Sequence, residues 1–142
     1  MDFKKLANQY RDELLDNVLP FWLEHSQDLE FGGYFSCLDR EGKVFDTDKF
    51  IWLQGREVWM FSMLYNKVEK RQEWLDCAVQ GGEFLKKYGH DGNYNWYFSL
   101  DRSGRPLVEP YNIFSYTFAT MAFGQLSLAT GNQEYADIAK KT

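Results

Sequence analysis

An internal repeat is the feature that most constrains how this chain can fold. The segment Leu38–Gly42 recurs as Leu100–Gly104, so that Asp39 matches Asp101, 62 positions further along the chain. Each copy lies in a predicted β-hairpin, because short apolar runs flank it and its glycine supplies the positive φ of the turn. Each hairpin is followed by predicted helices. A repeat of this length that contains two helices is typical of stacked helical hairpins, in which each unit buries its apolar face only against its neighbours.

The apolar spacing predicts five helices and two kinds of helix. The helices cover about Phe3–His25, Lys49–Tyr65, Glu73–Tyr88 and Tyr111–Ala129, and a fifth begins at Gln133. The second and fourth are apolar almost all round, whereas the others are amphipathic. This alternation indicates an inner and an outer ring of helices. The predicted fold class is therefore all-α, an α/α toroid with short β-hairpins in its loops.

Three local features complete this prediction. Pro20 lies late in the first helix and is expected to kink it or split off its last turn. Thr47 or Asp48 can cap the helix that follows the first hairpin. Gly81 and Gly82 lie in the middle of a helix, where each costs about 1 kcal/mol relative to alanine, so we expect a neighbouring element to approach closely there.

Arg56 is the main candidate for a functional residue. On a helix it falls in one column with Trp52, Trp59 and Met63. Burying an unpaired guanidinium is very unfavourable, so Arg56 is expected to meet a carboxylate, a set of carbonyls, or a wet cavity that holds an oxygen-rich ligand. From this pattern alone, a structural buried ion pair and a ligand site are equally good interpretations. Glu57 points about 100° away around the helix, which favours a salt-bridged outer position.

Composition and charge exclude several classes of function. The formal net charge is -5 and the basic residues are scattered, so there is no electrostatic footprint for nucleic acid or an anionic membrane. Aromatic residues make up 18% of the chain, which suits core packing or walls around a sugar. We expect a neutral small-molecule partner. No metal cluster and no phosphate loop is visible, so no cofactor is expected.

The cysteines and the N-terminal segment bear on localisation. Cys37 and Cys77 lack CxxC spacing, the start of the chain is charged rather than continuously apolar, and no run of about 18 apolar residues occurs. These observations favour a cytoplasmic protein with free thiols.

Several segments resemble the N-terminal portion of the N-acylglucosamine 2-epimerase family. The resemblance runs from about Phe21 to Gly124, and the most specific stretch is Lys49 with Trp-Leu-Gln-Gly-Arg at 52–56 and Trp59. It implies an (α/α)6 barrel of twelve helices and an isomerase that interconverts N-acetylglucosamine and N-acetylmannosamine. In that reaction a base removes the proton at carbon 2, an enediolate forms, and an acid returns the proton to the other face. Some members respond to nucleotides, but no nucleotide site is visible here.

The resemblance also assigns roles to residues. The arginine of the family motif contacts the oxygen that becomes negative, and this catalytic role carries over to Arg56. Trp52 and Phe114 occupy equivalent positions of the 62-residue repeat and are candidates for the wall of a sugar site. Tyr111 and Ser115, at the entry to the same helix as Phe114, complete the expected substrate-binding set.

The chain also departs from the family pattern. Members are close to three times as long, and their two acid/base histidines lie on later inner helices; His25 and His90 do not match them. We therefore expect residues 1–142 to form a single incomplete domain that is inactive alone, since general acid/base groups commonly contribute about 10² to 10⁴ in rate. A partial toroid would expose the apolar side of its last helices, which invites association, including a possible homo-oligomer.

Other functions remain open from the sequence. One is another sugar epimerase or isomerase of the same superfamily, such as a cellobiose 2-epimerase or a mannose isomerase. A glycoside hydrolase on the same toroid is less favoured, because hydrolysis needs two carboxylates that flank the bond and the inner faces carry no such pair. A non-catalytic carbohydrate-binding or protein-interaction module would fit the aromatic surplus and the missing histidines.

Overall fold

The computed structural model describes all residues from 1 to 142 and is mainly helical, with two small sheets. The helical segments are α1 (Phe3–Glu13), the π-helical turn η1 (Leu14–Val18), α2 (Leu19–His25), α3 (Ile51–Lys67), α4 (Gln72–Tyr88), α5 (Phe114–Thr130) and α6 (Gln133–Lys141). The strands are β1 (Cys37–Leu38), β2 (Val44–Asp46), β3 (Lys49–Phe50), β4 (Ser99–Leu100) and β5 (Pro106–Val108). The five predicted helices and both predicted hairpins are confirmed.

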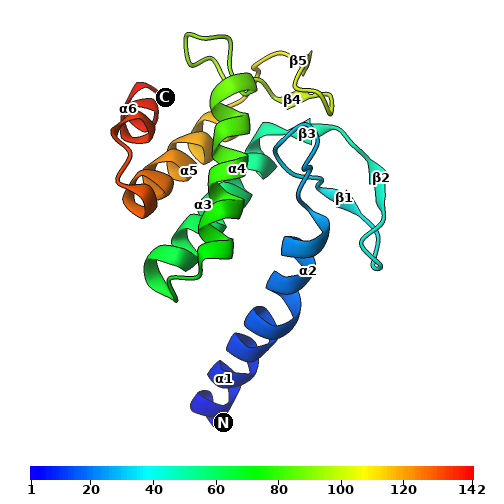
Figure 1. Ribbon diagram of the computed structural model, residues 1–142, viewed down its shortest axis with the longest axis vertical. Helices are drawn as coiled ribbons and strands as arrows, with labels where there is room; N and C mark the ends of the chain where they lie inside the picture. Colours follow the sequence, from blue (N-terminus) through cyan, green and yellow to red (C-terminus); the bar gives the residue numbers. More distant parts are fainter.

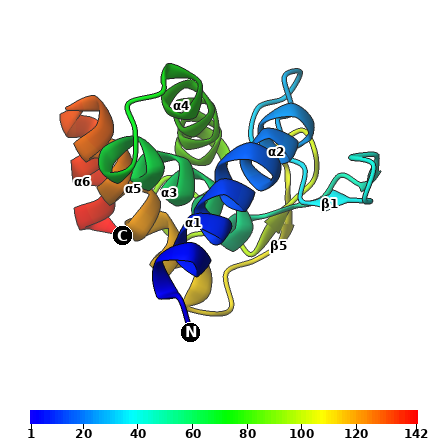
Figure 2. The same ribbon diagram turned by 90° about the horizontal axis from the view of Figure 1, so that it is seen from below.

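The segments α1, η1 and α2 form one continuous rod, whose α1 end projects away from the other helices (Figures 1 and 2). Proline lacks the N–H that an α-helix needs, and its ring crowds the carbonyl four residues before it. The chain accommodates Pro20 with the wider π-helical turn just before it, so the rod is interrupted but not broken. No residue of α1 is buried, and the apolar stripe of this helix has no partner within the chain.

The core lies between α3, α4 and α5. Helices α3 and α5 run in the same direction side by side, α4 packs against α3, and α6 packs against α5 (Figure 1). The two glycines of α4 permit the close approach that their position predicted. A Cβ at Gly81 would lie 2.2 Å from the Tyr34 hydroxyl, and one at Gly82 would lie 2.4 Å from Leu126. The prediction of tight packing there is confirmed.

The second hairpin gains a third strand that the sequence did not reveal. Strand β1 pairs with β2, while β3, β4 and β5 form a three-stranded antiparallel sheet in that order. Lys49 of β3 pairs with Leu100 of β4, which places the entry of α3 against the second hairpin. The predicted cap at Thr47 or Asp48 is wrong. Phe50 occupies the N-cap of α3, and the free Ile51 N–H donates instead to the Phe98 carbonyl at 3.0 Å.

A buried ionic cluster fastens these loops together. The fully buried ammonium of Lys49 donates to Asp28 Oδ2 at 2.9 Å, to the Gly32 carbonyl and to the Arg102 carbonyl at 2.9 Å. Arg102 also donates to both oxygens of Asp28, at 2.9 and 3.1 Å. Burial alone raises the pKa of Asp28, but the hydrogen bonds from Arg102 and Lys49 outweigh it and hold this pKa at about 2. All three donors of Lys49 are occupied, so its role is structural.

None of the helices is both long enough and apolar enough to cross a lipid bilayer.

Candidate functional site

Gln54 and Gly55, the two residues that precede Arg56, fix the position of α3 in the structure. The buried Gln54 side chain accepts from the Tyr34 N–H and donates to the Tyr34 carbonyl, both at 2.8 Å, and so ties the first loop region to the helix. Gly55 faces α5, where an added Cβ would lie 2.9 Å from the backbone carbon and oxygen of Phe118. Because α5 can approach this closely, the Phe118 side chain reaches the first turns of α3.

Arg56 lies beside two aromatic rings, which also pack against each other with their centres 6.2 Å apart. Its guanidinium carbon is 5.6 Å from the centre of the Trp52 ring and 5.0 Å from that of Phe118, within the range of cation–π contacts. The side chain is exposed, and no carboxylate or carbonyl of the chain binds it. The expectation that Arg56 is buried is therefore wrong for this chain, and of the two interpretations that the sequence left open, the structural ion pair is not found. What the structure offers is a positive charge flanked by aromatic rings and free to bind a ligand.

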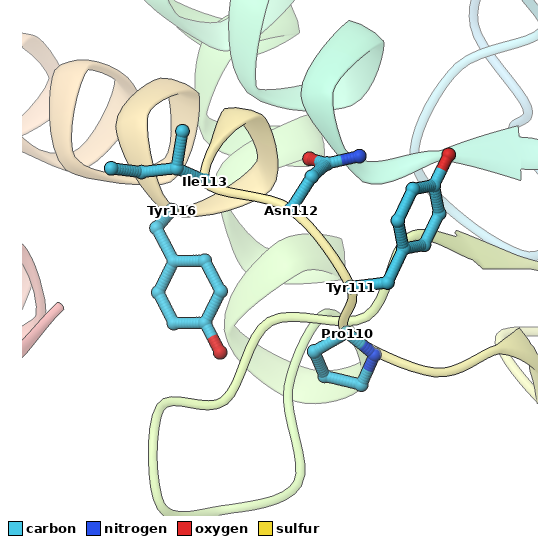
Figure 3. Close-up of a pocket in the computed structure, with 5 residues that line it drawn as sticks. All are labelled: Pro110, Tyr111, Asn112, Ile113 and Tyr116. Carbon is cyan, nitrogen blue, oxygen red and sulfur yellow. The ribbon is translucent and has the colours of Figure 1, made fainter.

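The segment that leads into α5 forms an open groove with the first turn of that helix. The groove has a volume of about 500 Å³, and Figure 3 shows its lining side chains, Pro110, Tyr111, Asn112, Ile113 and Tyr116. Tyr111 is 67% exposed, and its ring packs against that of Phe98 with the ring centres 4.7 Å apart. Asn112 accepts a hydrogen bond from the Phe114 N–H at 3.0 Å and thereby shapes the start of the helix.

The predicted substrate-binding residues fall into two groups. Trp52, Tyr111 and Phe114 present accessible aromatic surface, and Phe114 is 59% exposed at the first position of α5. Ser115 is 1% exposed and is therefore buried beneath this surface rather than part of it. The nearer of the two rings beside Arg56 belongs to Phe118, which the sequence analysis did not single out. Its position one helical turn after Phe114 on the same face was the available signal.

A second cavity lies on the other side of Arg56, between the α1–α2 rod and α3. We name it the α2–α3 pocket; it has a volume of about 210 Å³. Its lining residues are Val18, Trp22, Ser36, Leu53, Arg56, Glu57 and Met60. The walls are mainly apolar, and the hydroxyl of Ser36 is buried without a hydrogen-bond partner.

Glu57 lies inside this pocket and not in a salt-bridged outer position, so that prediction is wrong. The rod formed by η1 and α2 covers the side of α3 that carries Glu57, and no cation lies beside the carboxyl group. Burial raises its pKa from the ordinary 4.5 to about 8, despite a hydrogen bond with the Ser26 hydroxyl that acts in the opposite direction. Glu57 is therefore largely protonated at neutral pH.

The two histidines do not line either cavity. His25 at the end of α2 packs its ring at 4.9 Å on Phe21. The His90 ring stacks at 4.9 Å on Tyr94, and its Nδ1 accepts from the Gly92 N–H at 3.0 Å. Both rings are held by local packing contacts, which agrees with the expectation that neither residue belongs to the site.

The family model described as N-acylglucosamine 2-epimerase (GlcNAc 2-epimerase) matches residues 33–142. The N-acylglucosamine 2-epimerase of Mus musculus is 47% identical over 128 residues, which cover 87% of this chain and 30% of that protein. A cellobiose 2-epimerase of Dictyoglomus turgidum is 29% identical over 141 residues, covering 98% of this chain and 36% of that protein. This chain thus spans about a third of the length of the curated relatives it matches.

Solved structures agree with these matches. The cellobiose 2-epimerase from Bacillus thermoamylovorans superimposes with a TM-score of 0.88 at 31% identity, over 97% of this chain and 36% of that one. A D-mannose isomerase superimposes with a TM-score of 0.77 at 22% identity, over 89% of this chain and 32% of that one, and shares the fold. Since the family model covers most of the residues, including the Trp-Leu-Gln-Gly-Arg motif, the chain belongs to the N-acylglucosamine 2-epimerase family of sugar isomerases.

Proposed function

We propose that this chain provides the arginine side of the sugar site of an N-acyl-D-glucosamine 2-epimerase, which interconverts N-acetylglucosamine and N-acetylmannosamine. Its helices would form the first part of a closed (α/α)6 barrel. The observation that carries the proposal is the Arg56 guanidinium, which lies over the rings of Trp52 and Phe118 and has no hydrogen-bond or ion-pair partner in the protein. A cation arranged in this way is available to a ligand oxygen.

The chemistry of 2-epimerisation explains why a free guanidinium is needed. In the open-chain sugar, removal of the proton at carbon 2 moves an electron pair into the bond between carbons 1 and 2, and the oxygen on carbon 1 becomes negative. A guanidinium that is already in place stabilises this developing charge without reorganisation during the step. The faces of the aromatic rings beside Arg56 attract its positive charge and help to hold the guanidinium in position for this contact. The proton then returns to the opposite face, so the reaction involves no net oxidation and needs no redox cofactor.

Proton transfer requires a separate acid and base. His25 and His90 are held by local packing contacts and line neither cavity, so neither is proposed for this role. We propose that the acid and base belong to other parts of the complete gene product and that residues 1–142 alone are inactive. General acid/base groups commonly contribute about 10² to 10⁴ in rate, which is the loss expected when both are missing.

The N-acylhexosamine assignment rests on the relative similarity of two groups of proteins. Four mammalian N-acylglucosamine 2-epimerases are 46 to 47% identical to this chain, whereas the cellobiose 2-epimerases are 28 to 30% identical. The alternative function is that of a cellobiose 2-epimerase. The observation in its support is the close superposition of this chain on a cellobiose 2-epimerase.

Replacement of Arg56 in the complete gene product tests the proposal. The Arg56→Ala variant is expected to lower kcat for N-acetylmannosamine by about 10² to 10³, because one oxyanion donor is lost. Its thermal stability should stay unchanged, since Arg56 is exposed and makes no ion pair in this structure. Arg11→Ala, which removes an exposed arginine far along the rod, is the matched control and should keep full activity. An unchanged kcat in Arg56→Ala would refute the proposed role.

A further inference from the structure

We propose that Phe118 is a positioning residue, whose ring holds the Arg56 guanidinium on the side of α3 that faces α5. The inference rests on the proposed function, in which Arg56 meets the oxygen on carbon 1 of the sugar. It goes beyond that function by separating the roles of the two rings beside Arg56. Three observations carry it: Arg56 has no polar partner that fixes it, it borders two different surroundings, and Phe118 is firmly placed against α3.

The Arg56 side chain is held by no polar group of the protein. It is exposed and makes no hydrogen bond or ion pair, and its guanidinium has only the rings of Trp52 and Phe118 beside it, at 5.6 and 5.0 Å. An arginine side chain has many rotamers, so confining it to one place costs conformational entropy. A contact that confines it before the substrate binds therefore favours the reaction, because a preorganised charge needs no rearrangement during the step.

Arg56 borders two different surroundings on α3. On one side, Gly55 faces the backbone of α5. On the other side, Leu53 and Met60 line the α2–α3 pocket, and Arg56 itself forms part of the wall of that pocket. The guanidinium can therefore turn toward α5 or toward the pocket. Only the first orientation brings the charge to the helix that carries Phe114, a predicted substrate-binding residue.

The two rings beside Arg56 differ in what they can fix. Trp52 lies one helical turn before Arg56 on the same helix, so its ring borders Arg56 whatever the position of α5. Phe118 belongs to α5, and its ring is the nearer one to the guanidinium and also packs against the Trp52 ring. Cation–π attraction to Phe118 therefore draws the guanidinium toward α5. Phe118 is the residue that decides between the two orientations.

The close contact of the two helices places Phe118 firmly. A Cβ added at Gly55 would lie 2.9 Å from the carbonyl carbon and oxygen of Phe118 and 3.1 Å from the Phe118 Cβ. The Phe118 backbone is thus in contact with α3, and its side chain is half-buried, so packing restricts the rotamers of the ring. The ring provides a fixed point for the more flexible arginine.

Replacement of Phe118 in the complete gene product tests this role with N-acetylmannosamine as the substrate. Phe118→Leu keeps an apolar side chain but removes the face of the ring. It is expected to lower kcat about three- to tenfold and to leave KM within about twofold of wild type, because the contact of Arg56 with the oxyanion is made in the transition state. Phe118→Tyr keeps the ring, so its kcat should stay within about twofold of wild type.

Tyr65→Leu is the matched control. It removes another half-buried ring that lies beside a cation, since Lys70 Nζ is 4.2 Å from the centre of the Tyr65 ring near the other end of α3. The kcat of this variant should equal that of wild type. All variants are assayed well below the melting temperature of the least stable one, so that unfolding does not lower kcat.

A double-mutant cycle shows whether Phe118 acts through Arg56. In the Arg56→Ala background, Phe118→Leu should lower kcat by less than about twofold, because the group that Phe118 holds is already absent. An equal loss in both backgrounds would mean that Phe118 contacts the substrate or only supports the fold, and this result would overturn the proposal. An unchanged kcat in Phe118→Leu alone would overturn it as well.

The outcomes separate the positioning role of Phe118 from the proposed function. If Arg56→Ala loses activity and Phe118→Leu does not, the positioning role falls and the proposed function stands. If Arg56→Ala keeps full kcat, or if the wild type epimerises no N-acylhexosamine, both are overturned.

Discussion

Gly55 shows how one residue without a side chain determines what surrounds Arg56. Its Cα faces the backbone of α5, where a Cβ would lie 2.9 Å from the carbonyl carbon and oxygen of Phe118. Backbone atoms cannot swing away as a flexible side chain can. Any larger residue at position 55 must therefore push α5 outward and carry Phe118 away from the guanidinium.

We predict that Gly55→Ala destabilises the chain by about 1 to 3 kcal/mol, the usual cost of overpacking. The matched control is Gly124→Ala in α5, where an added Cβ meets nothing within 4 Å. That variant should instead gain about 0.5 to 1 kcal/mol, because alanine favours the helix. Urea unfolding followed by circular dichroism measures both. Equal effects of the two substitutions would show that α3 and α5 are not packed as closely as described.

Glu57 gives the chain a specific dependence of stability on pH. Its pKa is raised from 4.5 to about 8 in the folded state because the carboxyl group is buried. Between these two pH values the folded chain holds a proton that the unfolded chain has lost, so the free energy of unfolding falls as the pH rises from about 4.5 to 8. We predict that Glu57→Gln flattens this fall. Melting temperatures of the wild type and the variant, measured at pH 6 and pH 9, test this prediction. If the melting temperature falls equally in both proteins between these pH values, Glu57 is ionised in the folded chain and the prediction is wrong.

The loop elements depend on the buried cluster of Asp28, Lys49 and Arg102. Lys49 belongs to β3, Asp28 to the loop after α2, and Arg102 to the turn between β4 and β5. The cluster therefore connects three segments that are distant in sequence and holds them at the entry of α3. Removing Lys49 or Arg102 leaves the buried carboxylate of Asp28 with an unsatisfied group.

We predict that Lys49→Met destabilises the chain by about 3 to 5 kcal/mol, because Asp28 and two carbonyl groups lose a buried donor. Arg11→Ala, which breaks an exposed pair with Asp12, should change the free energy of unfolding by less than about 1 kcal/mol. Denaturant unfolding of both variants gives the comparison. A loss for Lys49→Met no larger than that for Arg11→Ala would show that the cluster does not fasten the loops.

Helices and hairpins could be predicted from the sequence because their signals are local. Apolar spacing gave the helices, the repeated Asp-Arg segment gave the hairpins, and the central pair Gly81–Gly82 indicated close packing. Strand β3 was not predicted, since two residues carry no periodicity and its partner Leu100 lies far along the chain. The Asp28–Lys49–Arg102 cluster was missed for the same reason.

The candidate site was harder to predict than the elements that carry it. Arg56 and Trp52 could be identified from the motif and its helical spacing, but exposure depends on which helices surround them. The expectation of a buried arginine assumed neighbours on every side of α3. Conversely, Glu57 was expected in a salt-bridged outer position. It lies in the α2–α3 pocket instead, because the α1–α2 rod covers that side of α3. This tertiary contact has no local signal in the sequence.

At the scale of the whole molecule, large apolar side chains are exposed on helices α1 and α5. On α1 these include Phe3 and Tyr10, and on α5 they include Phe114 and Leu128. Exposed apolar surface of this kind marks a place where other protein elements bind. The chain spans about a third of the length of its relatives, so its exposed faces are consistent with the proposed position within a larger ring of helices.

The most direct test of the central claim is proton NMR of N-acetylmannosamine in D2O. One sample contains residues 1–142 and the other contains the complete gene product. We predict that deuterium appears at carbon 2 only with the complete gene product, because enediolate formation exposes that position to solvent protons and needs an acid and a base that residues 1–142 do not supply. Exchange in neither sample would contradict the assignment as an N-acylhexosamine 2-epimerase, and exchange with residues 1–142 alone would contradict the proposed division of roles.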